Sequence, residues 1–226
     1  MRALIRFGKR DRLRFISHLD LQRFFQRALN RTGLPIAFSQ GFNPHPVMSF
    51  ASALAVGWTS EYEVLDVKLA REVDASLVEE MMRLALPEGL PVLEVRLVDD
   101  RHPAMMALVT CADYRIALAG DGAAEVLAAI PEFLSKESVL GVRRTKSGER
   151  EIDIRPLAAE LRAGNGWLDA RLKLTERDTL KPDVLLAGLS AIAGAPVPGV
   201  RVHRLCLLGE GESGAATPIM ELSFKR

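Results

Sequence analysis

The feature that most restricts the fold is a helix-free stretch, residues 35–69, between two helical patterns. It holds two segments with strand character, 35–39 and 62–69, the second alternating as YEVLDVKL. Successive parallel strands need a long crossover, usually a helix, between them, whereas two strands in direct succession fit an antiparallel sheet. The other elements predicted in this half are a strand at 3–7, helices from His18 and at 74–86, and a strand at 92–98.

The resulting order, β-α-β-β-α-β, is that of a ferredoxin-like unit, in which four antiparallel strands carry both helices on one face. The second half repeats the order of elements without clear sequence identity to the first. Periodicity there predicts strands at 111–119, 139–145, 152–154, 167–173 and 200–208, and helices at 123–134 and 181–193. We therefore predict an α+β protein of two tandem ferredoxin-like units with antiparallel sheets.

The predicted units are residues 1–99, with a basic helix and an ordered loop, and residues 100–226, with a flexible C-terminal tail. The tail is assigned from three glycines at positions 209, 211 and 214, which lack the Lys-Ser/Thr of a phosphate-binding loop. An apolar content of 48% and a charged content of 26% over 226 residues describe an ordinary folded protein and argue against disorder.

Targeting and cofactor signals are missing from the sequence. The N-terminus lacks the apolar core of a signal peptide, and no run approaches the roughly 18 apolar residues that span a bilayer. We expect a cytoplasmic protein that does not contact a membrane. Cys111 and Cys206 stand far apart, with no CxxC or Cys/His grouping, so they provide no ligand set for zinc or an iron–sulfur cluster. We expect no metal and no cofactor, and both cysteines in the core.

The first helix carries the strongest functional signal. Ser17 and Asp20 have the spacing of a helix cap, and Gly33 with Pro35 marks the other end. Arginines at 23, 27 and 31 follow one edge of the helix beside its apolar face. Residues 1–50 hold nine Lys or Arg against two Asp, a formal charge of +7 in a chain of net charge +1. This asymmetry predicts an anion-binding surface, although a solvated helix flank is the alternative.

The loop after the helix adds polar groups to this surface. Gly41, Pro44 and Pro46 fix an irregular backbone, while neighbouring amide and imidazole groups stay available for hydrogen bonds, unless the loop is a purely structural turn. The residues we predict to bind RNA or another anion are Arg14, His18, Arg23, Arg27, Arg31, Gln40, Asn43 and His45.

Catalysis is the alternative role for two of these residues. His18 or His45 could act as a general base, with Asp20 as the orienting carboxylate. Residues two apart on a helix point about 200° apart, so Asp20 is better placed to cap the helix than to orient His18. We predict a binding or structural role for His18 and name both histidines as the catalytic candidates if the chain is an enzyme.

The residues also carry a resemblance. The N-terminal 70 residues are similar to the radical-SAM-linked family of bacterial proteins, a domain of unknown function found free or fused behind a radical-SAM enzyme. The likeness rests on the run from Phe15 to Asp20, the three arginines at 23, 27 and 31, the run from Ser39 to Pro46, and Ser60 with Glu61. The resemblance implies a radical-SAM partner and an RNA context. The chain lacks the three-cysteine motif that such an enzyme needs, so it is not the radical enzyme itself.

These observations predict a non-catalytic accessory protein that binds structured RNA and works with a radical-SAM protein. Two alternatives stay open. The plan of two ferredoxin-like units with a histidine near the first helix resembles that of the CRISPR repeat-processing ribonucleases. The first alternative is therefore metal-independent RNA cleavage. The other alternative is a protein-docking subunit that binds no nucleic acid.

Overall fold

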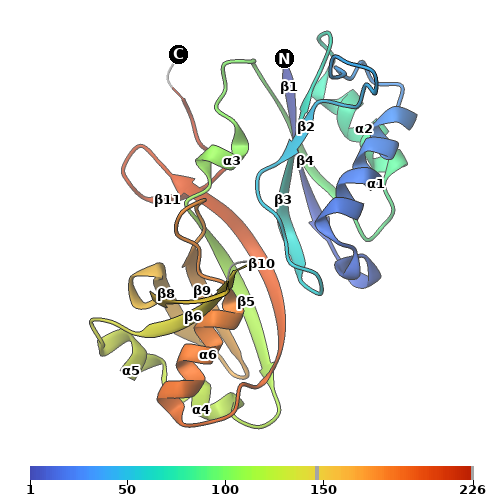
Figure 1. Cartoon of the computed structure of the whole chain (residues 1–226). Helices are drawn as coiled ribbons and strands as arrows, with labels where there is room; N and C mark the ends of the chain where they lie inside the picture. Colours follow the sequence, from blue (N-terminus) through green and yellow to red (C-terminus); the bar gives the residue numbers. More distant parts are fainter. Residues whose placement is uncertain (146–147, 225–226) are drawn as a thin grey trace. The chain divides into compact units, whose positions relative to one another are not determined.

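The computed structural model describes residues 1–145 and 148–224, and it divides into two compact units (Figure 1). The first unit holds Met1–Val109 together with the C-terminal segment from Cys206 onward, and the second holds Thr110–Leu205. The predicted division into residues 1–99 and 100–226 placed that C-terminal segment in the second unit, whereas its contacts place it in the first.

The first unit follows the predicted order of strands and helices. Its elements are β1 (Arg2–Lys9), the 3-10 turn η1 (Asp11–Phe15), α1 (His18–Arg31), β2 (Met48–Phe50), β3 (Thr59–Lys68), α2 (Ala75–Ala85), β4 (Val92–Val98) and the short α3 (Met105–Leu108). Strand β1 lies between β3 and β4 and is antiparallel to both, and β2 pairs antiparallel with β3. The predicted α+β class with antiparallel pairing is confirmed, and α1 and α2 pack together beside the sheet (Figure 1).

The second strand of this unit does not lie where the sequence analysis predicted it. Residues 35–39 make only isolated bridges, whereas β2 falls within the segment predicted as a loop. The cause is competition for the edge of β3, because the backbone amide of Lys68 donates to Val47 (2.9 Å) and that of Val47 donates to Ala37 (2.8 Å). The chain that returns after the loop therefore occupies the edge of β3, and residues 35–39 reach the end of that strand through the bridge of Ile36 to Leu69, where the Ala37 amide donates to the Lys68 carbonyl (2.9 Å).

Helix α1 is held to the sheet by aromatic side chains. Phe25 is fully buried, with its ring centroid 4.8 Å from that of Phe7 on β1 and 5.5 Å from that of Phe50 on β2. Leu21 and Leu29, one turn to either side, are buried in the same core. The helix therefore presents a single apolar edge inward, which fixes its remaining faces towards solvent.

The second unit departs from the predicted plan. Its elements are β5 (Cys111–Ala119), α4 (Ala123–Ala128), α5 (Ile130–Ser135), β6 (Leu140–Thr145), β7 (Gly148–Asp153), the 3-10 turn η2 (Arg155–Leu157), β8 (Ala158–Ala163), β9 (Trp167–Lys173), α6 (Pro182–Ala193) and β10 (Gly199–Glu210), whose last residues belong to the first unit. Strands β5, β9 and β8 form antiparallel pairs in that order, while β6 and β7 form a separate two-stranded hairpin. Because of that separate hairpin and the additional strand β8, the tandem ferredoxin-like arrangement is not confirmed.

Two further differences have local causes. The helix predicted at 123–134 is two short helices, because Pro131 starts a new helical segment and cannot donate a backbone hydrogen bond to the preceding turn. The C-terminal segment is not the predicted flexible tail: β11 (Ala216–Pro218) pairs antiparallel with the end of β10, and the next two side chains, Ile219 and Met220, are buried.

Among residues 1–145 and 148–224, no helix has both the length and the apolar character to cross a membrane.

Replacing Phe25 by Ala tests whether the aromatic contact anchors α1. We expect a loss of about 3–5 kcal/mol in the free energy of unfolding, because the change leaves a cavity between α1 and the strands β1 and β2. The control is Phe24→Ala, at the neighbouring half-buried position, for which we expect a clearly smaller loss. Urea unfolding followed by circular dichroism measures both, and equal losses would show that Phe25 is not the anchor.

Candidate anion-binding site

The start of α1 is closed by the predicted cap. The Ser17 hydroxyl oxygen accepts a hydrogen bond from the backbone amide of Asp20 at 3.1 Å, and the hydroxyl donates to an Asp20 carboxylate oxygen at 2.7 Å. The other carboxylate oxygen lies 3.4 Å from the Arg23 guanidinium. Both oxygens of Asp20 therefore have partners that hold the helix start in place, and among the described residues no hydrogen bond joins Asp20 to His18.

The three arginines of α1 are all exposed, as the spacing predicted. Arg31 donates to the backbone carbonyl of Ala85 at the end of α2, at 3.3 Å, and Arg23 lies 3.4 Å from the exposed Asp20 carboxylate. Arg27, between them, makes no hydrogen bond or ion pair with the described residues. Exposed pairs of this kind contribute little to stability, so the guanidinium groups are available to an anionic ligand.

Arg14 belongs to the turn η1 just before the helix and is half-buried. Its guanidinium carbon lies 4.6 Å from the centroid of the exposed Phe15 ring, at cation–π distance. Arg14 is therefore held against its neighbour, whereas Arg27 on the helix extends into solvent.

The loop from Phe38 to Pro46 is ordered by hydrogen bonds that cross its base. The backbone amide of Ser39 donates to the carbonyl of His45 at 2.9 Å, and the amide of His45 donates to the Ser39 hydroxyl at 3.2 Å. The imidazole Nδ1 of His45 lies 3.0 Å from the same hydroxyl. This bracing closes the base of the loop, and at the tip the Phe42 side chain is completely exposed.

The amides that the sequence placed in the site are also exposed. Gln40 and Asn43 flank Phe42 at the loop tip, and neither side chain makes a hydrogen bond with the described residues. Phe42 itself was not among the predicted site residues. Its signal in the sequence is an aromatic residue between Gly41 and Asn43 in a polar turn, where no apolar neighbour exists to cover it.

His18 packs into the unit rather than standing free on its surface. Its ring lies edge-on to Phe50, with centroids 5.2 Å apart, and is half-buried. Burial lowers the pKa of His18 below its ordinary value of 6.5, the charge of Glu63 acts to raise it, and that of Lys9 acts to lower it. The folded environment therefore favours the neutral imidazole.

Polar residues beneath His18 were missed by the sequence analysis. Lys9, Ser60 and Glu63 are almost completely buried at the end of the inner sheet face. The Lys9 ammonium donates to the backbone carbonyl of Ile16 at 3.1 Å, and so ties the end of β1 to the entry of α1. The sequence signal for this burial is a charged residue at an inward-facing strand position. Lys9, for example, continues the alternation of Ile5 and Phe7.

The geometry does not supply the carboxylate-held base that the catalytic alternative needs. No hydrogen bond among the described residues involves the His18 ring, and His45 is bonded to Ser39 and, at 3.4 Å, to the carbonyl of Asn43. Within residues 1–145 and 148–224, no group of three or more His, Cys, Asp or Glu side chains could hold a metal ion. Cys111 and Cys206 form no disulfide with each other and are half-buried. RNA cleavage stays an untested prediction.

Comparison with known proteins places the chain in a family. It belongs to the family described as "uncharacterized protein conserved in bacteria" (DUF2344), whose model matches residues 2–182. No curated protein matches the sequence. A crystal structure titled as that of an unknown protein from Galdieria sulphuraria is similar over 90% of this chain and 97% of that one, with 11% identity and a TM-score of 0.29. A score this low supports no inference about fold or function.

The environment of His18 predicts a dependence of stability on pH. Since its pKa is lower in the folded chain than the ordinary value of 6.5, the unfolded chain takes up the proton more readily. The stabilising effect of the neutral ring is present above about pH 6.5 and is lost as the pH falls through the folded-state value. We expect the melting temperature of the parent to fall more steeply between pH 7 and pH 5 than that of His18→Gln.

Thermal unfolding at steps of half a pH unit measures this difference. The control is His45→Gln, which removes an imidazole that is exposed rather than half-buried. Parallel curves for the parent and His18→Gln would show that the buried position of His18 does not influence stability.

Proposed function

We propose that this protein binds structured RNA through the first unit and presents it to a partner enzyme. The arginine edge of α1 contacts backbone phosphates, and the loop from Phe38 to Pro46 contacts an unpaired base. Proteins that bind unpaired nucleotides combine a cationic track for the backbone with exposed aromatic rings on which bases stack. The first unit has both parts, and the ordered loop keeps the aromatic ring in solvent.

The observation that carries the proposal is the position of Phe42. A phenylalanine normally gains free energy from burial, yet this ring is fully exposed on a loop that hydrogen bonds hold in one shape. The bracing between Ser39 and His45 closes the base of this loop and leaves Phe42 at its tip. Exposed Gln40 and Asn43 on either side provide the amide groups that recognise base edges.

The partner in this proposal is a radical-SAM protein, as the resemblance of the first 70 residues implies. The chain itself would supply binding and orientation, and the radical enzyme would supply the chemistry. This division of work agrees with a site made of arginines, amides and an aromatic ring, since these groups bind RNA without needing a titrating base.

The arginine edge is tested by replacing Arg23, Arg27 and Arg31 together by Ala. If each neutralises one phosphate of single-stranded RNA, the slope of log affinity against log salt should become less steep by about 2. A matched control, Arg71→Ala with Arg83→Ala and Arg101→Ala, removes the same charge from other exposed positions of the first unit. Filter binding at several salt concentrations gives both slopes. An unchanged slope in the α1 variant, or an equal change in the control, would contradict the proposal.

The stacking contact is tested by Phe42→Ala. Loss of one base–aromatic stack should weaken binding to a stem-loop RNA with unpaired loop bases about tenfold, with little change in the salt slope. Phe42→Tyr keeps an aromatic face and should bind like the parent. If Ala and Tyr variants bind equally, Phe42 does not stack on a base, and an affinity for RNA that is insensitive to salt would favour an apolar docking surface instead.

A further inference from the structure

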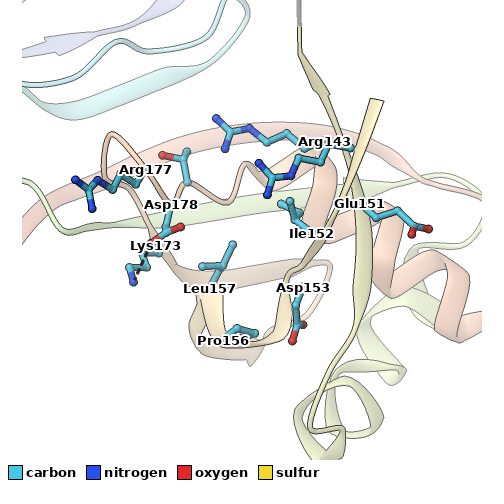
Figure 2. Close-up of a pocket in the computed structure, with 11 residues that line it drawn as sticks. Arg143, Glu151, Ile152, Asp153, Pro156, Leu157, Lys173, Arg177 and Asp178 are labelled. Atoms are coloured by element: carbon cyan, nitrogen blue, oxygen red, sulfur yellow. Dashed lines mark ion pairs between the residues drawn. The ribbon is translucent and has the colours of Figure 1, made fainter. Parts of the chain in front are cut away.

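The second unit contains a cavity of about 570 Å³ that the RNA proposal does not use (Figure 2). One wall is the β6–β7 hairpin and another is the loop that follows β9, while Pro156 and Leu157 line it below the hairpin. Four cationic side chains line the cavity, namely Arg143, Arg150, Lys173 and Arg177.

Two of these arginines stand directly opposite each other. Arg143 on β6 and Arg150 on β7 are cross-strand partners, so their side chains leave the hairpin on the same face. Like charges in opposite positions repel each other and destabilise a strand pair. Neither arginine makes a hydrogen bond or an ion pair in the part of the chain that the structure describes. A hairpin with this repulsion is stabilised by any anion that lies between the two guanidinium groups.

The opposite wall adds further positive charge. Figure 2 shows Arg143 extending over the cavity towards the loop that carries Arg177 and Asp178. That loop has a defined shape, because the amide of Asp178 donates to the Thr175 hydroxyl at 2.9 Å and the amide of Thr175 donates to the carbonyl of Asp178 at 3.0 Å. Arg177 lines the cavity from this loop, is exposed and makes no ion pair with the described residues, so its charge is not neutralised there.

The three acidic residues of the cavity form no ion pair with these arginines among the described residues. The Asp153 carboxylate accepts hydrogen bonds from the amides of Val139 and Arg155, both at 3.0 Å. Asp178 lies 3.6 Å from the Lys173 ammonium and thus compensates that cation. Glu151 alternates to the other face of β7 from Arg150, and Figure 2 shows its carboxylate on the side away from Arg177. Arg143, Arg150 and Arg177 are left without a carboxylate partner.

Arginines elsewhere in the same unit behave differently. On the β5–β9–β8 sheet, Arg171 forms a bidentate pair with Asp113 at 2.8 and 3.0 Å and also contacts Glu160 at 2.6 Å. Arg115 pairs with Asp169 through two bonds of 2.8 Å. These two sheet arginines therefore have carboxylates within hydrogen-bond distance. The cavity places three arginines together and provides none for them.

We propose that this cavity binds a phosphate group between Arg143, Arg150 and Arg177. Guanidinium groups recognise phosphate through paired N–H donors, and three of them around one cavity match the charge of a phosphate or diphosphate. The phosphate comes either from a small phosphorylated ligand, such as a nucleoside diphosphate, or from an RNA backbone. This inference uses residues of the second unit only and does not depend on the RNA contacts proposed for the first.

Isothermal titration of the full chain with inorganic pyrophosphate at low salt tests the site. We expect binding that weakens at least about tenfold in Arg143→Gln/Arg150→Gln, because charge-assisted hydrogen bonds to the ligand are lost. The control, Arg162→Gln/Arg201→Gln, removes two exposed arginines of the same unit that lie outside the cavity and should leave the affinity unchanged.

Thermal unfolding shows whether the hairpin variant, Arg143→Gln/Arg150→Gln, is folded. Without ligand, the hairpin variant should melt at or above the temperature of the parent, since a repulsion is removed, and pyrophosphate should raise the melting temperature of the parent only. No binding of pyrophosphate to the parent, or equal affinity in the parent and hairpin variant, overturns the proposal.

The source of the phosphate follows from two further titrations. If ADP displaces pyrophosphate and a short RNA without terminal phosphates does not, the site takes a small phosphorylated ligand. If the RNA displaces pyrophosphate in the parent, and the hairpin variant keeps only the affinity of the first-unit surface for that RNA, the site takes a backbone phosphate. Displacement by neither contradicts a phosphate site.

Discussion

The arrangement of the first unit depends on the contact of Phe25 with Phe7 and Phe50. This contact seats α1 on the sheet in a single rotation about its axis, because the helix has one apolar edge and the three rings interlock. The rotation decides that Arg23, Arg27 and Arg31 face solvent. It also brings His18, at the start of the helix, edge-on to Phe50. The properties of the candidate site are therefore consequences of core packing.

The elements with strong local signals were predicted from the sequence almost to the residue. The cap at Ser17, the left-handed Gly33, and strands β4, β5 and β9 depend on periodicity and turn chemistry within a few residues. The second strand was misplaced because local character cannot show which of two segments wins the edge of β3. Strand β8 was missed because AAELRA alternates only weakly.

Parts of both sites could not be predicted because they depend on register and depth. Arg143 and Arg150 are seven positions apart in the chain, and only the pairing of β6 with β7 sets them opposite each other. The burial of Lys9 and Glu63 becomes apparent once α1 covers that end of the sheet. Charge composition indicated a basic stretch in residues 1–50, whereas the arginines of the cavity lie in the second unit, whose residues 110–205 hold 14 Lys or Arg against 13 Asp or Glu. A charge count averages over such local groups.

The most direct test of the account is to locate bound RNA by ultraviolet cross-linking of the full chain to a stem-loop RNA, followed by mass spectrometry of the cross-linked peptides. The account predicts cross-links at Phe42 and its neighbours in the loop from Phe38 to Pro46, because a stacked base absorbs light in contact with the ring. The cross-links should disappear at high salt together with binding. Cross-links confined to other segments, with the loop unmodified, would contradict the proposed RNA surface.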